Sequence, residues 1–193
     1  MTRAIVLAST SRYRAELLRR IVPTFAQVAP AADEAPLPSE TPAARATRLA
    51  EAKARAVVAS QPDALVIGSD QVAALGTMVL HKPGTTTSAR EQLRASSGNT
   101  VDFYTGLCVI DGSTGHAASH LDHTRAVFRV LNDGEIDRYI ALEHPLDCAG
   151  SFKCEGAGVA LFERIETTDP TALIGLPLIA LARLLRAAGC AVP

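Results

Sequence analysis

Residues 65–71, Leu-Val-Ile-Gly-Ser-Asp-Gln, form an apolar run that breaks at a Gly-Ser pair and then presents the carboxylate of Asp70. This pattern predicts a buried strand that ends at a site, because ligands of open α/β sheets gather at the carboxyl ends of the strands. Twelve residues after the aspartate, Lys82 offers a compact positive charge for an anionic ligand. A carboxylate and a lysine together suit a metal-bound phosphate.

Two serines and an arginine lie between the first predicted strand and the helix that follows it. Ser9, Ser11 and Arg14 surround the start of this helix, where backbone N–H groups bind phosphate and the side chains add further donors. The serines are equally typical of a helix N-cap with solvent-facing arginines nearby, and both interpretations stay open here. The motif G-x-x-x-x-G-K-[ST] is missing, which excludes a P-loop NTPase.

Three charged residues are candidates for the centre of the site. Asp70 would bind Mg²⁺ or activate a water molecule, and its place after so apolar a strand favours this over a purely local acceptor role. Glu34, in the acidic stretch 32–34, supplies a second oxygen ligand or is simply solvated. Lys53 shares the apolar face of a predicted helix, so its ammonium either extends to water or faces a site.

The elements that must position these residues alternate between apolar strands and amphipathic helices. Strands are predicted at 3–8, 25–29, 64–74, 78–80, 101–110, 116–131 and 159–165, with a hairpin turn at 111–115. Helices are predicted at 13–21, 42–60, 87–96 and 132–142, with one or two more in 170–188 broken near Pro177. Proline- and glycine-rich stretches at 30–42 and 145–158 predict loops.

Length, charge and hydropathy limit the class of protein. With 193 residues the chain can build one substantial core, and we expect a single domain over 1–193. A net charge of −1 offers no bulk attraction to nucleic acid or to an anionic membrane, so we expect neither as a partner. No stretch reaches the roughly 18 apolar residues of a membrane span. We therefore expect a cytoplasmic protein.

Cysteines and histidines do not predict a metal cluster. Four cysteines without a C-x-x-C pair are expected to be free thiols. His116, His120 and His123 lie on a predicted strand, where residues four apart are roughly 13 Å from each other. Zinc ligands must converge within about 2.1 Å of one ion, so we do not expect a structural zinc.

As an ordered set, these motifs resemble the Maf family of nucleotide pyrophosphatases, from about residue 3 to residue 188. The opening motif is Leu7-Ala8-Ser9-Thr10-Ser11 with Arg14, Leu17 and Leu18, and the helix motif is Leu49-Ala50 with Lys53-Ala54. The central motif is Gly68-x-Asp70 with Lys82-Pro83, and Ser97-Gly98, Tyr104-Thr105-Gly106 and Gly175-Leu176-Pro177 also fit. The resemblance implies an elongated mixed β-sheet flanked by helices, similar to inosine triphosphatases, in a molecule that is commonly dimeric.

The resemblance also implies a reaction and a set of residues. A nucleoside triphosphate would be cleaved between its α and β phosphates with a divalent cation, Mg²⁺ or Mn²⁺. Asp70 matches the catalytic acid that orients or deprotonates water, and Glu34 matches an acidic position near the metal. The phosphate-handling positions are matched by Ser9, Ser11, Arg14, Lys53 and Lys82. Mg²⁺ and cations stabilise charge on the transferring phosphoryl group while a carboxylate positions water.

One branch of the family, which hydrolyses 7-methyl-GTP, is matched more closely. Tyr13, Gln71 and Glu155 correspond to its base-selecting positions, whereas pyrimidine-preferring relatives carry threonine after the aspartate. An aromatic face attracts the cationic methylated base, and a carboxylate accepts from guanine N1–H and the exocyclic amine. Without the resemblance, Tyr13 would be only the first apolar position of its helix and Glu155 a solvated loop acid.

Two departures and two alternative functions complete the sequence-based picture. Arg12 replaces a common proline and either touches the triphosphate or faces solvent, and His81 replaces a glycine often found before the Lys-Pro pair. One alternative is a pyrophosphatase for unmodified dTTP, UTP or another NTP. The other is a non-catalytic nucleotide-binding regulator of cell division, which would not need Asp70. An enzyme of nucleic-acid caps is disfavoured by the neutral charge.

Overall fold

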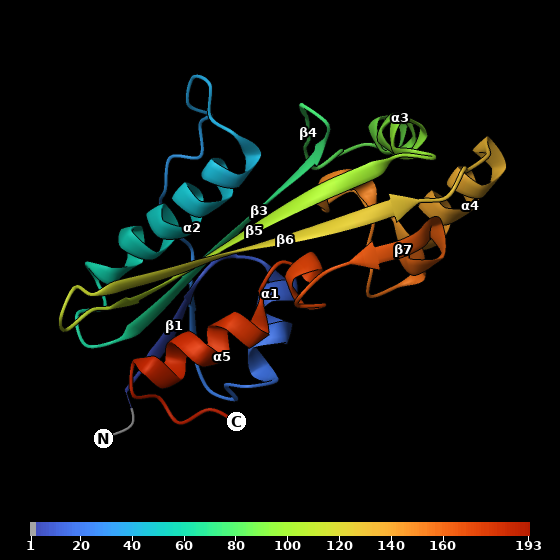
Figure 1. Cartoon of the computed structure of the whole chain (residues 1–193). Helices are drawn as coiled ribbons and strands as arrows, with labels where there is room; N and C mark the ends of the chain where they lie inside the picture. Colours follow the sequence, from blue (N-terminus) through green and yellow to red (C-terminus); the bar gives the residue numbers. More distant parts are fainter. Residues whose placement is uncertain (1–2) are drawn as a thin grey trace. The chain divides into compact units, whose positions relative to one another are not determined.

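The computed structural model describes residues 3–193, in which seven strands form one mixed sheet accompanied by five α-helices (Figure 1). The strand order is β2-β1-β3-β5-β6-β7, and β4 pairs with β3 off this path. The strands are β1 (Ile5–Ala8), β2 (Ala26–Val28), β3 (Leu65–Leu75), β4 (Met78–Leu80), β5 (Thr100–Asp111), β6 (Ala117–Phe128) and β7 (Phe162–Glu166). The helices are α1 (Arg12–Arg19), α2 (Pro42–Val58), α3 (Thr86–Ser96), α4 (Asp133–Glu143) and α5 (Leu178–Ala187).

The structure confirms the predicted α/β class and the order of the elements. One boundary is wrong: residues 159–161, predicted to open the last strand, belong to a 3₁₀ segment, Ala157–Leu161, and β7 begins at Phe162. All four cysteines are free thiols. Within residues 3–193, every helix is too short or too polar to cross a membrane.

The described chain divides into two compact units. The first comprises the chain up to Asp70 together with Thr105–Asp122 and Asp169–Pro193, and the second comprises Gln71–Tyr104 and His123–Thr168. Three strands, β3, β5 and β6, contribute residues to both units. The expectation of a single domain therefore stays a prediction that depends on how the two units unfold.

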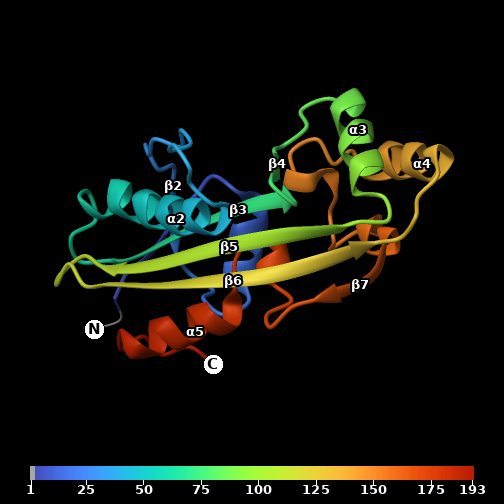
Figure 2. The same cartoon turned by 45° about the horizontal axis from the view of Figure 1, so that its top comes forward.

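In the first unit, the alternation of side chains along β1 and β3 builds two apolar layers. Ile5, Leu7, Leu65 and Ile67 belong to a cluster completed by α1 and α5. The intervening Val6, Ala8 and Val66 belong to a second cluster completed by α2. Figures 1 and 2 show α2 on one side of these strands and α1 and α5 on the other. Residues 65–67 of β3 therefore face these two helical layers alternately.

The register of the parallel strands shows where a site can open in the first unit. Ala8 of β1 pairs with Gly68 of β3 and with Val28 of β2, so β1 and β2 both end at this level. β3 continues to Leu75, in agreement with the strand predicted at 64–74, and pairs antiparallel with β4. The expectation that Asp70 lies at the end of its strand is therefore wrong; it is β1, the partner of β3, and β2 beyond it that end at the level of Gly68.

The second unit has its own core, in which four phenylalanines pack edge to face. Phe152 contacts Phe103, Phe128 and Phe162 with ring centroids 4.9–5.9 Å apart and interplanar angles near 80°. α3 and α4 lie side by side over this unit (Figure 2). Asn132 caps α4, in a reciprocal arrangement with Glu135.

Candidate active site

A buried lysine forms ion pairs with two carboxylates near the carboxyl ends of β1 and β2. The Nζ atom of Lys53 lies 2.6 Å from Oδ1 of Asp70 and 3.0 Å from Oε1 of Glu34. The side chains of Lys53 and Asp70 are 9% and 11% exposed, whereas Glu34 is 56% exposed. The structure thus brings together three of the predicted site residues. The Lys53 ammonium does not extend to water but pairs with two carboxylates, and its role in a site stays a prediction.

Lys53 reaches Asp70 because α2 packs directly on the backbone of the sheet. Gly68, two residues before Asp70 and on the same side of β3, has no Cβ; one would clash with the carbonyl oxygen of Ala50. A Cβ at Gly106 on β5 would likewise clash with the carbonyl oxygen of Ala46. Two glycines therefore let the helix approach closely enough for a lysine on its buried face to meet the strand carboxylate.

Glu34 belongs to a loop that α2 holds by two arginines one turn apart. Arg45 donates to the carbonyl oxygen of Glu34 at 3.1 Å, and Arg48 donates to that of Ala35 at 3.1 Å. Arg48 also forms a two-pronged ion pair with Glu40, with distances of 2.5 and 2.8 Å. This pair lowers the pKa of Glu40 to about 2. The loop is therefore anchored to α2 at Glu34 itself and at the residues that follow it.

The serines and the arginine of the first motif form one hydrogen-bonded group. Ser11 caps α1, its Oγ accepting from the backbone N–H of Arg14 at 3.3 Å, so the capping interpretation is confirmed for this serine. Oγ of Ser9 accepts from the Ser11 N–H at 3.1 Å and from Nη1 of Arg14 at 3.4 Å. Gln27 of β2 holds the carbonyl oxygens of both serines. Each serine hydroxyl still has its own proton to donate.

Arg14 is a half-buried cation whose surroundings favour an anionic ligand. Its Nε donates to the carbonyl oxygen of Gly175 at 2.8 Å. Burial lowers the pKa of the guanidinium, while the negative charges of Asp70 and Glu34 act in the opposite direction. A desolvated positive charge of this kind gains more from a phosphate than an exposed one would.

Arg12 and Tyr13 interact with each other at the start of α1. The Arg12 guanidinium lies over the Tyr13 ring, 4.7 Å from its centroid, and donates to the phenol oxygen at 2.9 Å. Tyr13 is half-buried and Arg12 is exposed. A cation already lies on the aromatic ring, which is the type of contact expected for a positively charged base.

The second unit holds the other three predicted site residues. Gln71 is a half-buried residue of β3, directly after Asp70. Lys82 is exposed in the segment between β4 and α3, where Gln92 of α3 holds the carbonyl oxygen of His81 at 3.0 Å. Glu155 is exposed, and its Oε2 accepts from the thiol of Cys154 at 3.6 Å. Their roles stay predictions.

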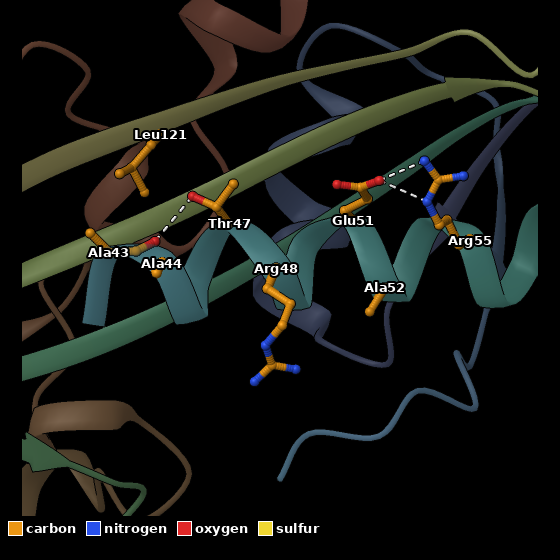
Figure 3. Close-up of a pocket in the computed structure, with 8 residues that line it drawn as sticks. All are labelled: Ala43, Ala44, Thr47, Arg48, Glu51, Ala52, Arg55 and Leu121. Carbon is orange, nitrogen blue, oxygen red and sulfur yellow. Dashed lines mark hydrogen bonds and ion pairs between the residues drawn. The ribbon is translucent and has the colours of Figure 1, made fainter. Parts of the chain in front are cut away.

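A groove of about 650 Å³ on the outer face of α2 is separate from these residues (Figure 3). Its lining combines small side chains of the helix with Leu121 of β6. The two arginines along it, Arg48 and Arg55, form ion pairs with Glu40 and Glu51. None of the predicted site residues lines it, so it is not a candidate for phosphate binding.

The side chains around Lys53 that could bind a metal are the carboxylates of Asp70 and Glu34. No group of three or more His, Cys, Asp or Glu side chains suited to a metal occurs in residues 3–193. The carboxylates of Asp70 and Glu34 share one lysine partner, which places two hard oxygen donors at the same ammonium. Mg²⁺ is commonly held by one or two carboxylates plus substrate phosphates, so the pair fits Mg²⁺ bound together with a nucleotide.

Some residues of the site could not be named from the sequence. Gln27, Arg45 and Gly175 contact predicted residues or their backbone, and Ser69 contacts Gly175. Ser69 and Gly175 carried a signal: a serine at an inward position of an otherwise apolar strand needs a buried partner, and Gly175 belongs to a motif that resembles the family. The others act through contacts between distant segments, and local patterns do not reveal such contacts.

The fold and this ionic centre define an α/β protein with a mixed sheet and a buried lysine that pairs with two carboxylates. Residues 4–188 match the family of Maf-like proteins, and the chain belongs to that family. It is 56% identical over 189 residues to a 7-methyl-GTP pyrophosphatase of Xanthomonas campestris pv. campestris (strain 8004), covering 98% of each chain. It is 52% identical to a protein of the same name from Nitrosococcus oceani, covering 96% of this chain and 93% of the relative.

A solved structure supports the predicted architecture. The Ham1 protein of Staphylococcus aureus superposes with a TM-score of 0.55 over 96% of this chain and 99% of its own, at 14% identity. At this identity the similarity concerns the fold alone.

Proposed function

We propose that the chain is a nucleotide pyrophosphatase that hydrolyses 7-methyl-GTP to 7-methyl-GMP and pyrophosphate. The observation that carries the proposal is the pair of carboxylates, Asp70 and Glu34, held by the buried Lys53. The identity to relatives named 7-methyl-GTP pyrophosphatase supports the choice of substrate. We expect the enzyme to act on the cytoplasmic nucleotide pool, and the homodimer implied by the family resemblance stays a prediction.

In this proposal, the cations of the first unit bind the triphosphate. Lys53 is buried and Arg14 half-buried, both beside acceptors, and the hydroxyls of Ser9 and Ser11 add donors beside them. Lys82 is proposed as a further phosphate ligand on the family resemblance alone. Asp70 and Glu34 would hold Mg²⁺ or Mn²⁺, which supplies Lewis-acid stabilisation of charge on the phosphate oxygens.

Asp70 is proposed to prepare the nucleophile. A water oxygen forms a bond to the α-phosphorus, and the bond from this phosphorus to the α–β bridging oxygen breaks. Pyrophosphate leaves with that electron pair, and the proton of the water passes to the carboxylate. The contact with Lys53, at 2.6 Å, holds the Asp70 carboxylate in a fixed orientation for this role.

Three residues are proposed to select the base. Tyr13 would stack on the cationic 7-methylguanine, Glu155 would accept from its N1–H and amine, and Gln71 would complete the recognition. The cation already lying on the Tyr13 ring supports the first of these roles. Family resemblance supports the other two.

The experiment is pyrophosphate release with Mg²⁺ from matched concentrations of 7-methyl-GTP, GTP, dTTP and UTP. Preference for 7-methyl-GTP is the expected outcome. Preference for an unmodified nucleotide would contradict the assignment of the base-selecting residues while keeping the reaction. Binding without release from any nucleotide would favour the regulator.

Asp70→Asn tests the catalytic assignment. The amide keeps the shape of the side chain but accepts a proton poorly, so we expect kcat to fall by about 10³-fold or more. Nucleotide affinity, measured by calorimetry without metal, should change less than about threefold. Turnover close to that of the wild type would refute the role of Asp70.

A further inference from the structure

Ser69, the neighbour of Asp70, faces the opposite side of β3. Its side chain is fully buried, and its Oγ lies 2.8 Å from the carbonyl oxygen of Gly106 and 2.9 Å from that of Gly175, so its single hydroxyl proton is shared between these two acceptors. Because side chains alternate along a strand, the carboxylate of Asp70 points to α2 while this hydroxyl points to the layer of α1 and α5. The adjacent residues Ser69 and Asp70 therefore make contacts on opposite faces of β3.

The Gly175 carbonyl is shared between Ser69 and Arg14. Arg14 Nε donates to the same oxygen at 2.8 Å, and a carbonyl oxygen has two lone pairs, so both donors can be accepted together. Gly175 has a backbone φ of +120°, a conformation that residues other than glycine rarely adopt. A Cβ there would also lie 3.4 Å from Arg14 Nε. The position of this carbonyl is thus set by the backbone and held by two side chains.

We propose that Ser69 is a positioning residue for Arg14. Its hydroxyl holds the Gly175 carbonyl, and this carbonyl holds the guanidinium so that Nη1 meets Ser9 and the phosphates. The inference rests on the proposed function in one respect, namely that Arg14 binds phosphate. Ser69 itself touches no substrate.

Thr105 provides a matched comparison within the same unit. It is also buried, 1% exposed, and its Oγ1 donates to the carbonyl oxygen of Ala172 at 3.0 Å, in the same segment as Gly175. Its acceptor is not the carbonyl that holds Arg14. Removing either hydroxyl deletes a buried hydrogen bond to this segment, but only the loss of Ser69 disturbs the carbonyl that orients the guanidinium.

The test is a double-mutant cycle on the affinity for inorganic triphosphate, measured by calorimetry. Ser69→Ala is expected to raise Kd about fivefold, the effect of one ordinary hydrogen bond. Arg14→Lys keeps the charge but cannot donate through Nε, so adding Ser69→Ala to it should change Kd less than about twofold. Thr105→Val should change Kd less than about twofold in both backgrounds.

Other results of the cycle would contradict the proposed role of Ser69. An unchanged Kd for Ser69→Ala, or a fivefold effect that persists in Arg14→Lys, would overturn the proposal, because Ser69 would then act without Arg14. A purely structural role would lower the urea midpoint of Ser69→Ala and Thr105→Val alike without this coupling. The cycle needs no 7-methyl-GTP turnover, so its failure and the failure of the proposed function are separate results.

Discussion

Lys53 combines two roles that are usually divided between residues. Its ammonium contacts two carboxylates, and one of them, Asp70, is buried. A buried ion pair adds little net stability, but an unpaired buried charge is costly. The same lysine is proposed to bind phosphate, so loss of its charge should affect both folding and turnover.

Lys53→Met should therefore lower the free energy of unfolding by about 3 kcal/mol, because it leaves the Asp70 carboxylate buried without its ammonium partner. Urea unfolding followed by circular dichroism measures this. Lys82→Met is the matched control, since Lys82 is exposed, and its stability should change by less than about 0.5 kcal/mol. Both variants should lose activity. Equal stability of the two variants would show that the buried pair is not a stabilising contact.

At the residue scale, the sequence identified candidate residues, but it did not show which residues they contact. Lys53 could be found because helical periodicity places it between Leu49 and Val57, and Asp70 because it follows an apolar run. That these two residues meet each other depends on how α2 crosses β3, and this crossing has no local signal. Ser69 and Gly175 lie 106 positions apart, so their contact was not predictable from spacing.

At the scale of elements, the sequence placed every helix and strand of the described chain within a few residues. Caps and breaks explain the agreement: Thr41, Thr85 and Asn132 begin their helices by accepting a backbone N–H. The two errors have physical causes. β3 continues past Asp70 because β4 pairs with it, and 157–161 turns as a 3₁₀ segment because small residues permit it.

Gly68→Ala tests whether the close approach of α2 to β3 builds the site. The added methyl would clash with the Ala50 carbonyl, so the helix must move or strain, at a cost of about 3 kcal/mol. Because Lys53 lies on that helix, kcat/KM should fall as well. Stability comes from urea unfolding and activity from pyrophosphate release.

Gly134→Ala is the control for this prediction. Gly134 is an exposed residue of α4, where alanine favours the helix and the nearest atoms are the ends of flexible side chains. This variant should keep both stability and activity. If Gly68→Ala behaved in the same way, α2 would not depend on the missing Cβ.

At the scale of the whole molecule, a chain with a net charge of −1 is expected to bind a polyanion. The necessary positive charge is therefore local, and in the first unit the half-buried Arg14 and the buried Lys53 both lie beside acceptors. This agrees with the sequence-based expectation that phosphate binding needs a confined basic site. Such a site favours a small nucleotide over a nucleic acid.

The two compact units raise the question of whether the molecule unfolds as one. β3, β5 and β6 run from one unit into the other, so neither unit can lose these strands without breaking the backbone pairing of its neighbour. Continuous strands of this kind favour a single cooperative transition, which would support the single domain predicted from the sequence.

Two native cysteines can report on the units separately. Cys108 is fully buried in the first unit, and burial raises the pKa of its thiol. Cys154 lies in the second unit, where burial, with the charge of Glu155, raises its pKa to about 12. At neutral pH both thiols should react slowly with iodoacetamide while folded, because the thiolate is the reactive form, and rapidly once unfolded.

We expect brief iodoacetamide labelling across a urea series, read by peptide mass spectrometry, to give the same midpoint for Cys108 and Cys154. Lys53→Met, which alters only the first unit, should then lower both midpoints together, because a cooperative molecule transmits a local loss of stability to every probe. Labelling of Cys154 at a lower urea concentration than Cys108, or a shift confined to Cys108, would instead identify two domains that unfold independently. In that case the catalytic carboxylates and the proposed base-selecting Glu155 would belong to separately stable parts, and substrate binding would have to bring them together.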